Sequence, residues 1–311
     1  MEEKLVNKKK TRISIVSLLL IAVLLLTGCG QTIEEKVAEL RDQTANHVYE
    51  TIEKPKAGKL PDDGAVFNLK KSGSKVDKDY YDAYLKSAAK YAAKLKEGKE
   101  KIDYRALGEA AMAVKELGGD PKNVDGVNLI DYLNDQEAVK AAGLPAECYA
   151  AIALNYCKED SASLHNYDQA VMDSIEYGKK YEGKMNEAEY NGLALMTLSY
   201  YKTMPMVAVA IDGSLNRLKD LQDKDGGFGS CEADATVACG LACVGVDPST
   251  FKKDDDSKDL MTSLLSYETD GGFANKAKGK VDERATVLVF TALNMYSYRI
   301  DEKNYLMPDL K

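Results

Sequence analysis

The 311-residue sequence contains no tryptophan and only two histidines, His47 and His165. Neither histidine has the spacing to other ligand-type side chains that a metal site requires. The chain also contains no glycine-rich phosphate loop, no nucleophile motif and no basic patch. These absences argue against the obvious enzymatic functions and against nucleic acid as a partner.

Disulfide bonding is limited by the number of cysteines. Cys29 is followed by five more, and an odd number cannot pair completely within one chain. Cys239 and Cys243 are four residues apart in a helical pattern, which could place two thiolates on one face for a metal. The alternative, which we favour, is that these are small buried core side chains. We therefore expect no bound metal and no cofactor. The five are Cys148, Cys157, Cys231, Cys239 and Cys243.

The first 28 residues have the pattern of an export signal peptide. Basic residues up to Arg12 precede an apolar run from Ile13 to Leu26, interrupted only by Ser17. The run has about 14 residues, whereas a permanent membrane-spanning helix needs roughly 20. The segment is therefore predicted to direct export rather than to remain as a membrane span.

The end of this run, Leu26-Thr27-Gly28-Cys29, resembles the bacterial lipobox. The resemblance implies cleavage before Cys29 and a diacylglyceryl group on its sulfur. It also implies attachment to the extracytoplasmic face of the cell membrane. The alternative is an ordinary signal anchor in which Cys29 has no role.

The remainder of the chain is acidic. The first 28 residues carry a net charge of +3, so the whole-chain charge of −8 becomes −11 for residues 29–311. Such a charge argues against nucleic acid and against broad adhesion to anionic lipid. Because 45% of the residues are hydrophobic, the chain can build a sizeable core.

Helical periodicity dominates after residue 31, and strand patterns are nearly absent. Thr32 to Glu35 forms a capping box that predicts a helix start. We expect a tether and first helix over 29–61 and one helical domain over 62–311. Twelve helical segments, or six hairpins, are predicted at about 33–52, 63–72, 78–96, 102–117, 127–134, 145–157, 167–179, 186–201, 206–222, 233–245, 257–268 and 282–298.

The turns between these helices repeat. Asp225-Gly226-Gly227-Phe228 is matched by Asp270-Gly271-Gly272-Phe273, and an Ala-Thr-Val helix start follows each copy. In each copy the glycine pair permits a sharp turn with positive φ. The phenylalanine that follows is expected to pack against the two helices and hold the turn. A repeat of this length is typical of helical arrays.

These Asp-Gly-Gly-Phe turns resemble those of the prenyltransferase and squalene-cyclase repeat superfamily. Secreted bacterial members and the vertebrate cobalamin carriers are similar over the early hairpins. The resemblance, over about residues 62–298, implies an all-α fold, an α/α toroid of about six hairpins around a central cavity. The chain departs from the family's enzymes because it lacks their tryptophan motifs, their Asp-rich motif and the histidine of their zinc site. The fold is therefore better supported than any activity.

In such a toroid the second helix of each hairpin is inner, and the inner helices begin around one mouth. Their first turns supply acidic, basic and aromatic side chains that we consider candidate ligand-binding residues. Helix capping is the alternative role for the acids, because the helix dipole stabilises them by about 0.3–1 kcal/mol each. The candidates are Tyr104, Arg105, Glu109, Glu147, Tyr149, Glu189, Tyr190, Glu232, Asp234, Asp282 and Arg284.

The leading hypothesis is a non-catalytic lipoprotein that binds a small molecule or peptide at an acidic mouth. We expect that mouth to select cationic or neutral polar ligands. Two alternatives stay open: a terpenoid or prenyl-group enzyme with degenerate motifs, and an interaction scaffold of the cell envelope. An open aromatic cavity would favour the enzyme, and a cavity filled by large side chains would favour the scaffold.

Overall fold

The computed structural model describes residues 31–175, 180–300 and 305–306, so the predicted export signal and Cys29 lie outside the described residues. The chain divides into two compact units, Met1–Lys36 and Val37–Lys311. Helix α2 (Ile33–Thr51) begins in the first unit. Its start is the predicted capping box: the backbone N–H of Thr32 donates to Glu35 Oε2 at 3.0 Å, and that of Glu35 donates to Thr32 Oγ1 at 3.2 Å. This prediction is confirmed.

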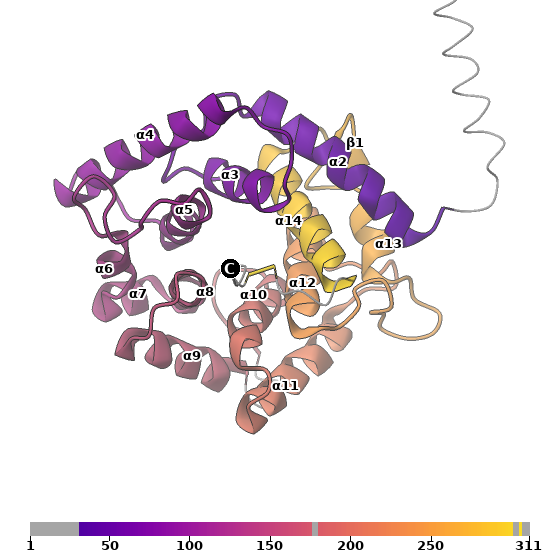
Figure 1. The fold of residues 1–311 in the computed structure, drawn as a ribbon. Coiled ribbons are helices and arrows are strands. Elements are labelled where there is room, and N and C mark those ends of the chain that lie inside the picture. The colour runs from indigo at the N-terminus through magenta and orange to yellow at the C-terminus, as the bar shows by residue number, and fades with distance from the viewer. Residues whose placement is uncertain (1–30, 176–179, 301–304, 307–311) are drawn as a thin grey trace, which may run out of the picture. The chain divides into compact units, whose positions relative to one another are not determined.

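The described part of the second unit is all-α, as predicted, apart from two short strands. β1 (Glu268–Thr269) and β2 (Gly272–Phe273) form an antiparallel pair in one of the repeated turns. The helices alternate along the chain between an outer set and an inner set (Figure 1). After α2, the outer set is α4 (Lys78–Lys96), α6 (Leu129–Leu133), α7 (Gln136–Ala142), α9 (Ala162–Ile175), α11 (Pro205–Leu221) and α13 (Leu260–Leu265). The inner set is α3 (Asp62–Lys71), α5 (Tyr104–Glu116), α8 (Leu144–Tyr156), α10 (Glu187–Leu198), α12 (Cys231–Val244) and α14 (Glu283–Ile300).

The inner helices contact one another in a closed order. α3 packs on α5, α5 on α8, α8 on α10, α10 on α12, α12 on α14, and α14 returns to α3. α12 is rich in alanine and cysteine and contains Gly240, and all its residues except Glu232 and Val244 are buried. Small side chains let neighbouring backbones approach closely, so this helix can pack between α10 and α14. The core of the unit therefore lies on the inner helices.

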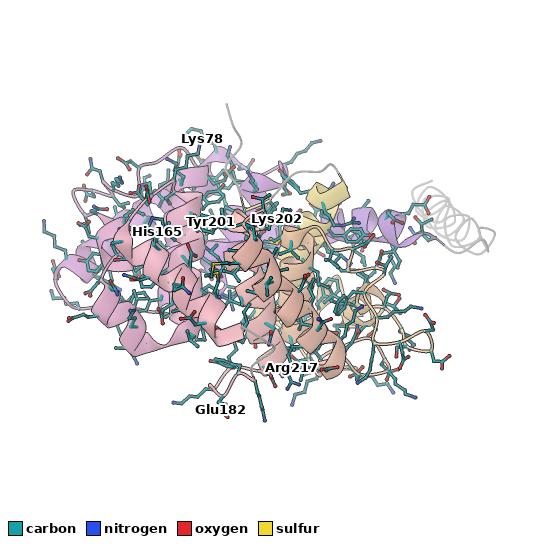
Figure 2. All side chains as sticks on the ribbon, turned by 90° about the horizontal axis from the view of Figure 1, so that it is seen from below. Lys78, His165, Glu182, Tyr201, Lys202 and Arg217 are labelled. Carbon is teal, nitrogen blue, oxygen red and sulfur yellow. The ribbon has the colours of Figure 1, made fainter. Side chains whose placement is uncertain are left out.

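The inner helix α10 starts and ends on opposite sides of the unit. Figure 2 shows Glu182, just before α10, on the side opposite Tyr201 and Lys202, just after it. Arg217 lies on the first side and pairs with Glu187 at the start of α10, with 2.8 Å between Arg217 Nε and Glu187 Oε1. We call the side where α10 starts the mouth side and the opposite one the far side.

One helix was not predicted from the sequence. α7 lies in what we predicted to be a connection between the segments 127–134 and 145–157. The side chain of Asp135 caps it by accepting from the N–H of Ala138 at 3.2 Å, and Val139 anchors it in the core. The segment has only one buried residue, Val139, which is too little apolar periodicity for a sequence pattern to reveal.

The repeated turns use their two glycines differently. Gly226 and Gly271 have positive φ, as predicted, at 89° and 80°. Gly227 is required for space, because a Cβ there would lie 2.7 Å from Asp234 Oδ2. The phenylalanines are buried as expected, and their N–H groups also tie each turn to the next inner helix. Phe228 donates to Asp234 Oδ1 at 2.6 Å and Phe273 to Thr286 Oγ1 at 2.9 Å.

Candidate functional site

A cavity of about 90 Å³ lies between the inner helices, and every one of the six contributes to its wall. Its lining is mostly apolar, and of its polar residues only Arg105 lies in the first turn of its helix. On α3, α5 and α14 the lining residues are three, four or seven positions apart, which places them on one face of each helix. The polar lining is Asn68, Arg105, Glu109, Tyr149, Thr236 and Thr291, and the apolar lining includes Phe67, Met112, Ile152, Leu193, Met196, Cys239, Leu288, Met295 and Leu306.

Three of the predicted site residues form a stack at the mouth side. The guanidinium of Arg105, which is 9% exposed, donates from Nε to Glu109 Oε1 at 2.8 Å. Its Cζ lies 5.6 Å from the ring centroid of Tyr149, a cation–π distance. Burial raises the pKa of Tyr149 to about 12, and the charge of Arg105 acts against this shift. The tyrosine therefore stays a neutral phenol at physiological pH.

Three more predicted residues belong to the same electrostatic group. Arg284 Nε pairs with Glu232 Oε2 at 3.0 Å. Burial and the nearby charge of Glu232 raise the pKa of Glu189, while Arg105 and Arg284 lower it. Glu189 lies four residues before Leu193 of the cavity wall, Glu232 four before Thr236, and Arg284 four before Leu288. Each therefore sits one helical turn outside the cavity on the same helix face.

We call this set the mouth cluster: Arg105, Glu109, Tyr149, Glu189, Glu232 and Arg284. Its three glutamates and two arginines almost balance, so it is less acidic than the sequence led us to expect. Two of the glutamates are engaged by arginines. Among the described residues, Glu189 is the glutamate of the cluster for which no ion pair is found.

An open depression of about 400 Å³ adjoins the cluster. It is lined by Asp103, Tyr104, Pro145 and their neighbours at the starts of α5 and α8. Arg105 and Tyr149 line both this depression and the cavity, so they stand between the two spaces. Tyr104, also predicted, is buried in the wall of the depression rather than in the cavity.

The other predicted residues do not line the cavity, and for Asp234 the expected placement at the rim is wrong. Asp234 is fully buried between α12 and α13, accepting from Phe228 N–H and, at 2.7 Å, from Ser263 Oγ. Asp282 caps α14 by accepting from Ala285 N–H at 2.9 Å. Asp282 therefore has the helix-capping role considered as the alternative, whereas Asp234 holds the turn at Phe228.

Glu147 and Tyr190 are also placed away from the mouth cluster. Tyr190 is buried, hydrogen-bonded to Ser174 of α9 and stacked on Tyr181 at 4.0 Å between centroids. Glu147 is buried near Tyr190, and its Oε2 has no hydrogen-bond partner among the described residues. Burial raises its pKa. Both side chains therefore lie in the packing between inner and outer helices.

Sequence reasoning missed a second polar group near α3. Asp63 is fully buried, and its Oδ1 accepts from Tyr84 Oη at 2.7 Å and from Gly58 N–H at 3.1 Å. Burial raises the pKa of Asp63 well above its usual value, and the charge of Glu109 adds to this shift. An aspartate in a first helical turn resembles an ordinary cap, so only its burial distinguishes it.

The five cysteines of the described residues are free and buried, as expected for core side chains. Cys239 lines the cavity, and Cys243 Sγ lies 3.8 Å from Met295 Sδ. Burial raises the pKa of Cys243 to about 12, so its thiol stays protonated and poorly nucleophilic. Across the described ranges, no group of three histidine, cysteine or acidic side chains is arranged to hold a metal ion.

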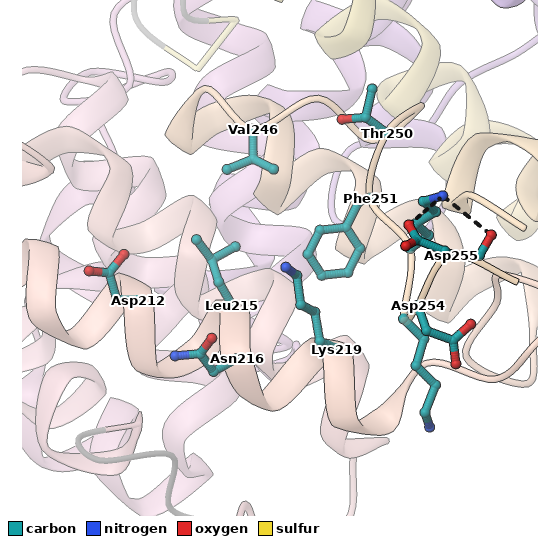
Figure 3. A pocket seen from close by; sticks show the side chains of 11 residues that line it. Asp212, Leu215, Asn216, Lys219, Val246, Thr250, Phe251, Asp254 and Asp255 are labelled. Atoms are coloured by element: carbon teal, nitrogen blue, oxygen red, sulfur yellow. Dashed lines mark hydrogen bonds and ion pairs between the residues drawn. The ribbon is translucent and has the colours of Figure 1, made fainter. Parts of the chain in front are cut away.

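A further depression of about 620 Å³ lies on the outside, between α11 and the loop after α12 (Figure 3). The lysine side chains here serve the fold. Lys253 Nζ donates to the carbonyls of Asp220 and Gln222, which end α11, and Lys252 Nζ lies 3.3 Å from Asp255 Oδ1. Asp254 accepts from Ser257 Oγ within its own loop. The side chains of Asp254, Asp255 and Asp256 are exposed, so this loop is solvated.

No protein-family model and no curated protein sequence matches this chain. In the part of the chain that the structure describes, no helix is both long and apolar enough to cross a membrane.

Proposed function

We propose that this protein is a lipid-anchored, extracytoplasmic binding protein whose helical body is an α/α toroid of six hairpins. The closed order of contacts among the inner helices supports the toroid. The observation that supports binding is the position of the Arg105–Tyr149 pair, between an open depression of about 400 Å³ and an apolar cavity. Concave sites with an apolar wall and a few convergent polar groups are typical of small-ligand binding.

The ligand is a small molecule or peptide with a cationic or neutral polar group at the mouth. Arg105 is neutralised by Glu109 and Arg284 by Glu232. Glu189 is then the carboxylate of the cluster for which no ion pair is found among the described residues, although the charges of Arg105 and Arg284 act on it. A ligand cation at this position would be screened less than at an exposed surface, because Glu189 is partly buried.

The mouth assignment predicts different effects for two glutamates of one helix. Glu189→Gln is expected to weaken binding of a cationic ligand about tenfold with little loss of stability. Glu187→Gln, which breaks the pair with Arg217 outside the cluster, is expected to lower stability by about 1 kcal/mol and leave binding unchanged. Ligands would be found by native mass spectrometry of protein purified from its own host, and their affinities measured by calorimetry. If Glu189→Gln behaves like Glu187→Gln, the mouth cluster is not the binding site.

The cavity volume favours a second candidate, an interaction scaffold of the cell envelope. A space of about 90 Å³ is much smaller than the roughly 300 Å³ of a typical ligand pocket. Native mass spectrometry separates the two candidates. A stoichiometric small molecule or peptide supports binding, whereas only co-purifying protein subunits would support the scaffold.

The lipid anchor gives a separate prediction. Changing Cys29→Ala should abolish incorporation of labelled fatty acid, because the thiol is the expected acyl acceptor. Cys157 is a buried cysteine directly after α8. Cys157→Ala is therefore the matched control and should incorporate label as the wild type does. Label on the Cys29→Ala protein would contradict the lipoprotein assignment.

A further inference from the structure

The segment Tyr305–Leu306 closes the cavity on the far side. The two residues are 2% and 4% exposed, and Leu306 is part of the cavity wall. Among the lining residues it is the one that no inner helix supplies. A non-helical piece of the chain thus occupies a space that the inner helices enclose.

Tyr305 is held by a specific polar contact and by two rings. Its hydroxyl donates to Asn68 Oδ1 at 2.7 Å. The Asn68 amide is itself fixed, because Nδ2 donates to Gly64 O at 2.7 Å and to Thr291 Oγ1 at 2.8 Å. The ring meets Phe67 and Tyr298 edge to face, with centroids 5.7 and 4.9 Å away. These contacts would recognise a tyrosine side chain wherever it came from.

Leu306 is held through its backbone as well as its side chain. Its carbonyl oxygen accepts from Tyr200 Oη at 2.6 Å, and Tyr200 belongs to the 3₁₀ turn η2 (Ser199–Tyr201) after α10. An aromatic side chain, a backbone carbonyl and an aliphatic side chain are therefore each met by groups of the inner helices or of η2. This is how a short peptide is bound.

The remaining space explains why the segment must leave before a ligand can enter. The cavity beside Leu306 is about 90 Å³, enough for a few water molecules but not for a peptide or an organic ligand. If the side chains of Tyr305 and Leu306 left their positions, the cavity would become larger on the far side. No side chain of the mouth cluster would have to move.

We propose that the far end of the cavity is a binding site for peptides carrying an aromatic residue followed by an aliphatic one, and that Tyr305–Leu306 is its internal occupant. This proposal rests on the proposed ligand-binding function and names the ligand class for the far side. Because the segment is tethered, its effective concentration is high, and a free peptide competes poorly in the wild-type protein.

The test uses the full chain carrying Tyr305→Ser and Leu306→Ser, with its fold checked by circular dichroism. The probe is a fluorescent peptide with the sequence of residues 304–308, Asn-Tyr-Leu-Met-Pro. Fluorescence anisotropy should show that the variant binds this peptide at least tenfold more tightly than the wild type does. A control peptide with serine in place of the tyrosine and leucine should bind at least tenfold more weakly.

Two adjacent tyrosines provide a matched control in the same background. Tyr200→Phe removes the donor to the Leu306 carbonyl and should weaken peptide binding about threefold to tenfold. Tyr201→Phe removes a hydroxyl that donates to Asn155 Oδ1 instead, and should leave peptide affinity unchanged. Equal effects of the two substitutions would argue against the assigned site.

A folded double-serine variant that binds no peptide would overturn the proposal and make Tyr305–Leu306 a fixed part of the core. A ligand retained at the mouth of that same variant would still support the proposed function. Should the double-serine variant not fold, hydrogen exchange on the wild type decides. Peptide at a concentration of several millimolar, comparable with the effective concentration of a tethered segment, is expected to speed exchange in the fragment containing Tyr305 at least tenfold. Unchanged exchange at that concentration would overturn the proposal.

Discussion

Raising the pH from 4.5 to 8 is expected to lower the free energy of unfolding by several kcal/mol, a direction opposite to that of most acid denaturation. Asp168 and Asp234 contribute to this together with Asp63, whose pKa burial also raises. Burial raises the pKa of Asp168 to about 7 and that of Asp234 to about 7, from 3.8. For Asp168 the effect of burial exceeds the opposing effects of the Tyr201 hydroxyl and the charge of His165, and Asp234 is fully buried.

The sign follows from the proton each state holds. Below pH 3.8 the folded and unfolded chains both carry these carboxyl protons, so they add no pH dependence. Between about pH 4 and 7 the unfolded chain has released them while the folded chain keeps them, so stability falls as pH rises. Above about pH 7 both states are ionised and the loss is complete. One pKa unit corresponds to about 1.4 kcal/mol, so each group contributes on the order of 3 kcal/mol between pH 4.5 and 8.

Urea unfolding of the wild type and of Asp168→Asn, at pH 4.5, 6 and 8, measures this. The amide cannot ionise, so the variant should lose about 3 kcal/mol less than the wild type over that range. Asp254→Asn is the contrasting control. The hydrogen bond from Ser257 lowers the pKa of Asp254, so its contribution is present above the unfolded pKa and is lost only as pH falls through the lower, folded value. Parallel curves for wild type and Asp168→Asn would show that this carboxyl ionises normally.

Most of the helices were predictable from the sequence because their burial follows a helical period. The second helix of each predicted pair contacts the next such helix, which agrees with the inner positions expected from the repeat. The capping box at Thr32 and the glycine turns were predictable because local backbone needs determine those residue types. α7 was missed because its capping and its one buried side chain leave little periodic pattern.

The candidate site was predictable only in part, because a first-turn position does not fix the direction of a side chain. Residues two apart on a helix point about 200° apart, so Glu232 and Asp234 cannot both face the cavity. The same rule separates Tyr149 from Glu147. Spacing of four residues from a lining position, as between Glu189 and Leu193, is the signal that could have selected the correct residues.

The far side of the cavity could not be foreseen at all. Tyr305 lies after the last predicted helix and carries no local motif. Its partner Asn68 is 237 residues away along the chain, on α3. The contact between Tyr305 and Asn68 forms only because the last inner helix, α14, packs against the first, α3. Sequence periodicity does not indicate which later segment of the chain will lie beside α3.

Gly240→Ala is expected to lower the free energy of unfolding by about 2 kcal/mol or more, a large effect for one methyl group. Gly240 of α12 meets Gly192 of α10, and a Cβ at Gly240 would overlap the carbonyl oxygen of Gly192. The contact is reciprocal, since a Cβ at Gly192 would lie 2.7 Å from the carbonyl oxygen of Thr236. Both obstacles are helix backbone, so the helices would have to separate instead of a side chain turning away.

Two opposing effects decide the size of this loss. Alanine favours a helix interior over glycine by about 1 kcal/mol, which stabilises the variant. Overpacking of a rigid interface costs about 1–3 kcal/mol and sometimes more. Because the added methyl meets backbone on a helix that also contacts α14, the second effect should exceed the first.

Gly108→Ala is the matched control, since its Cβ would lie 3.1 Å from Tyr149 O and 3.3 Å from Ala153 Cβ. There the two effects should nearly cancel, leaving stability within about 1 kcal/mol of the wild type. Urea unfolding at pH 5 compares the three proteins, and a Gly240→Ala protein as stable as the wild type would mean that α10 and α12 do not meet through their glycines in solution.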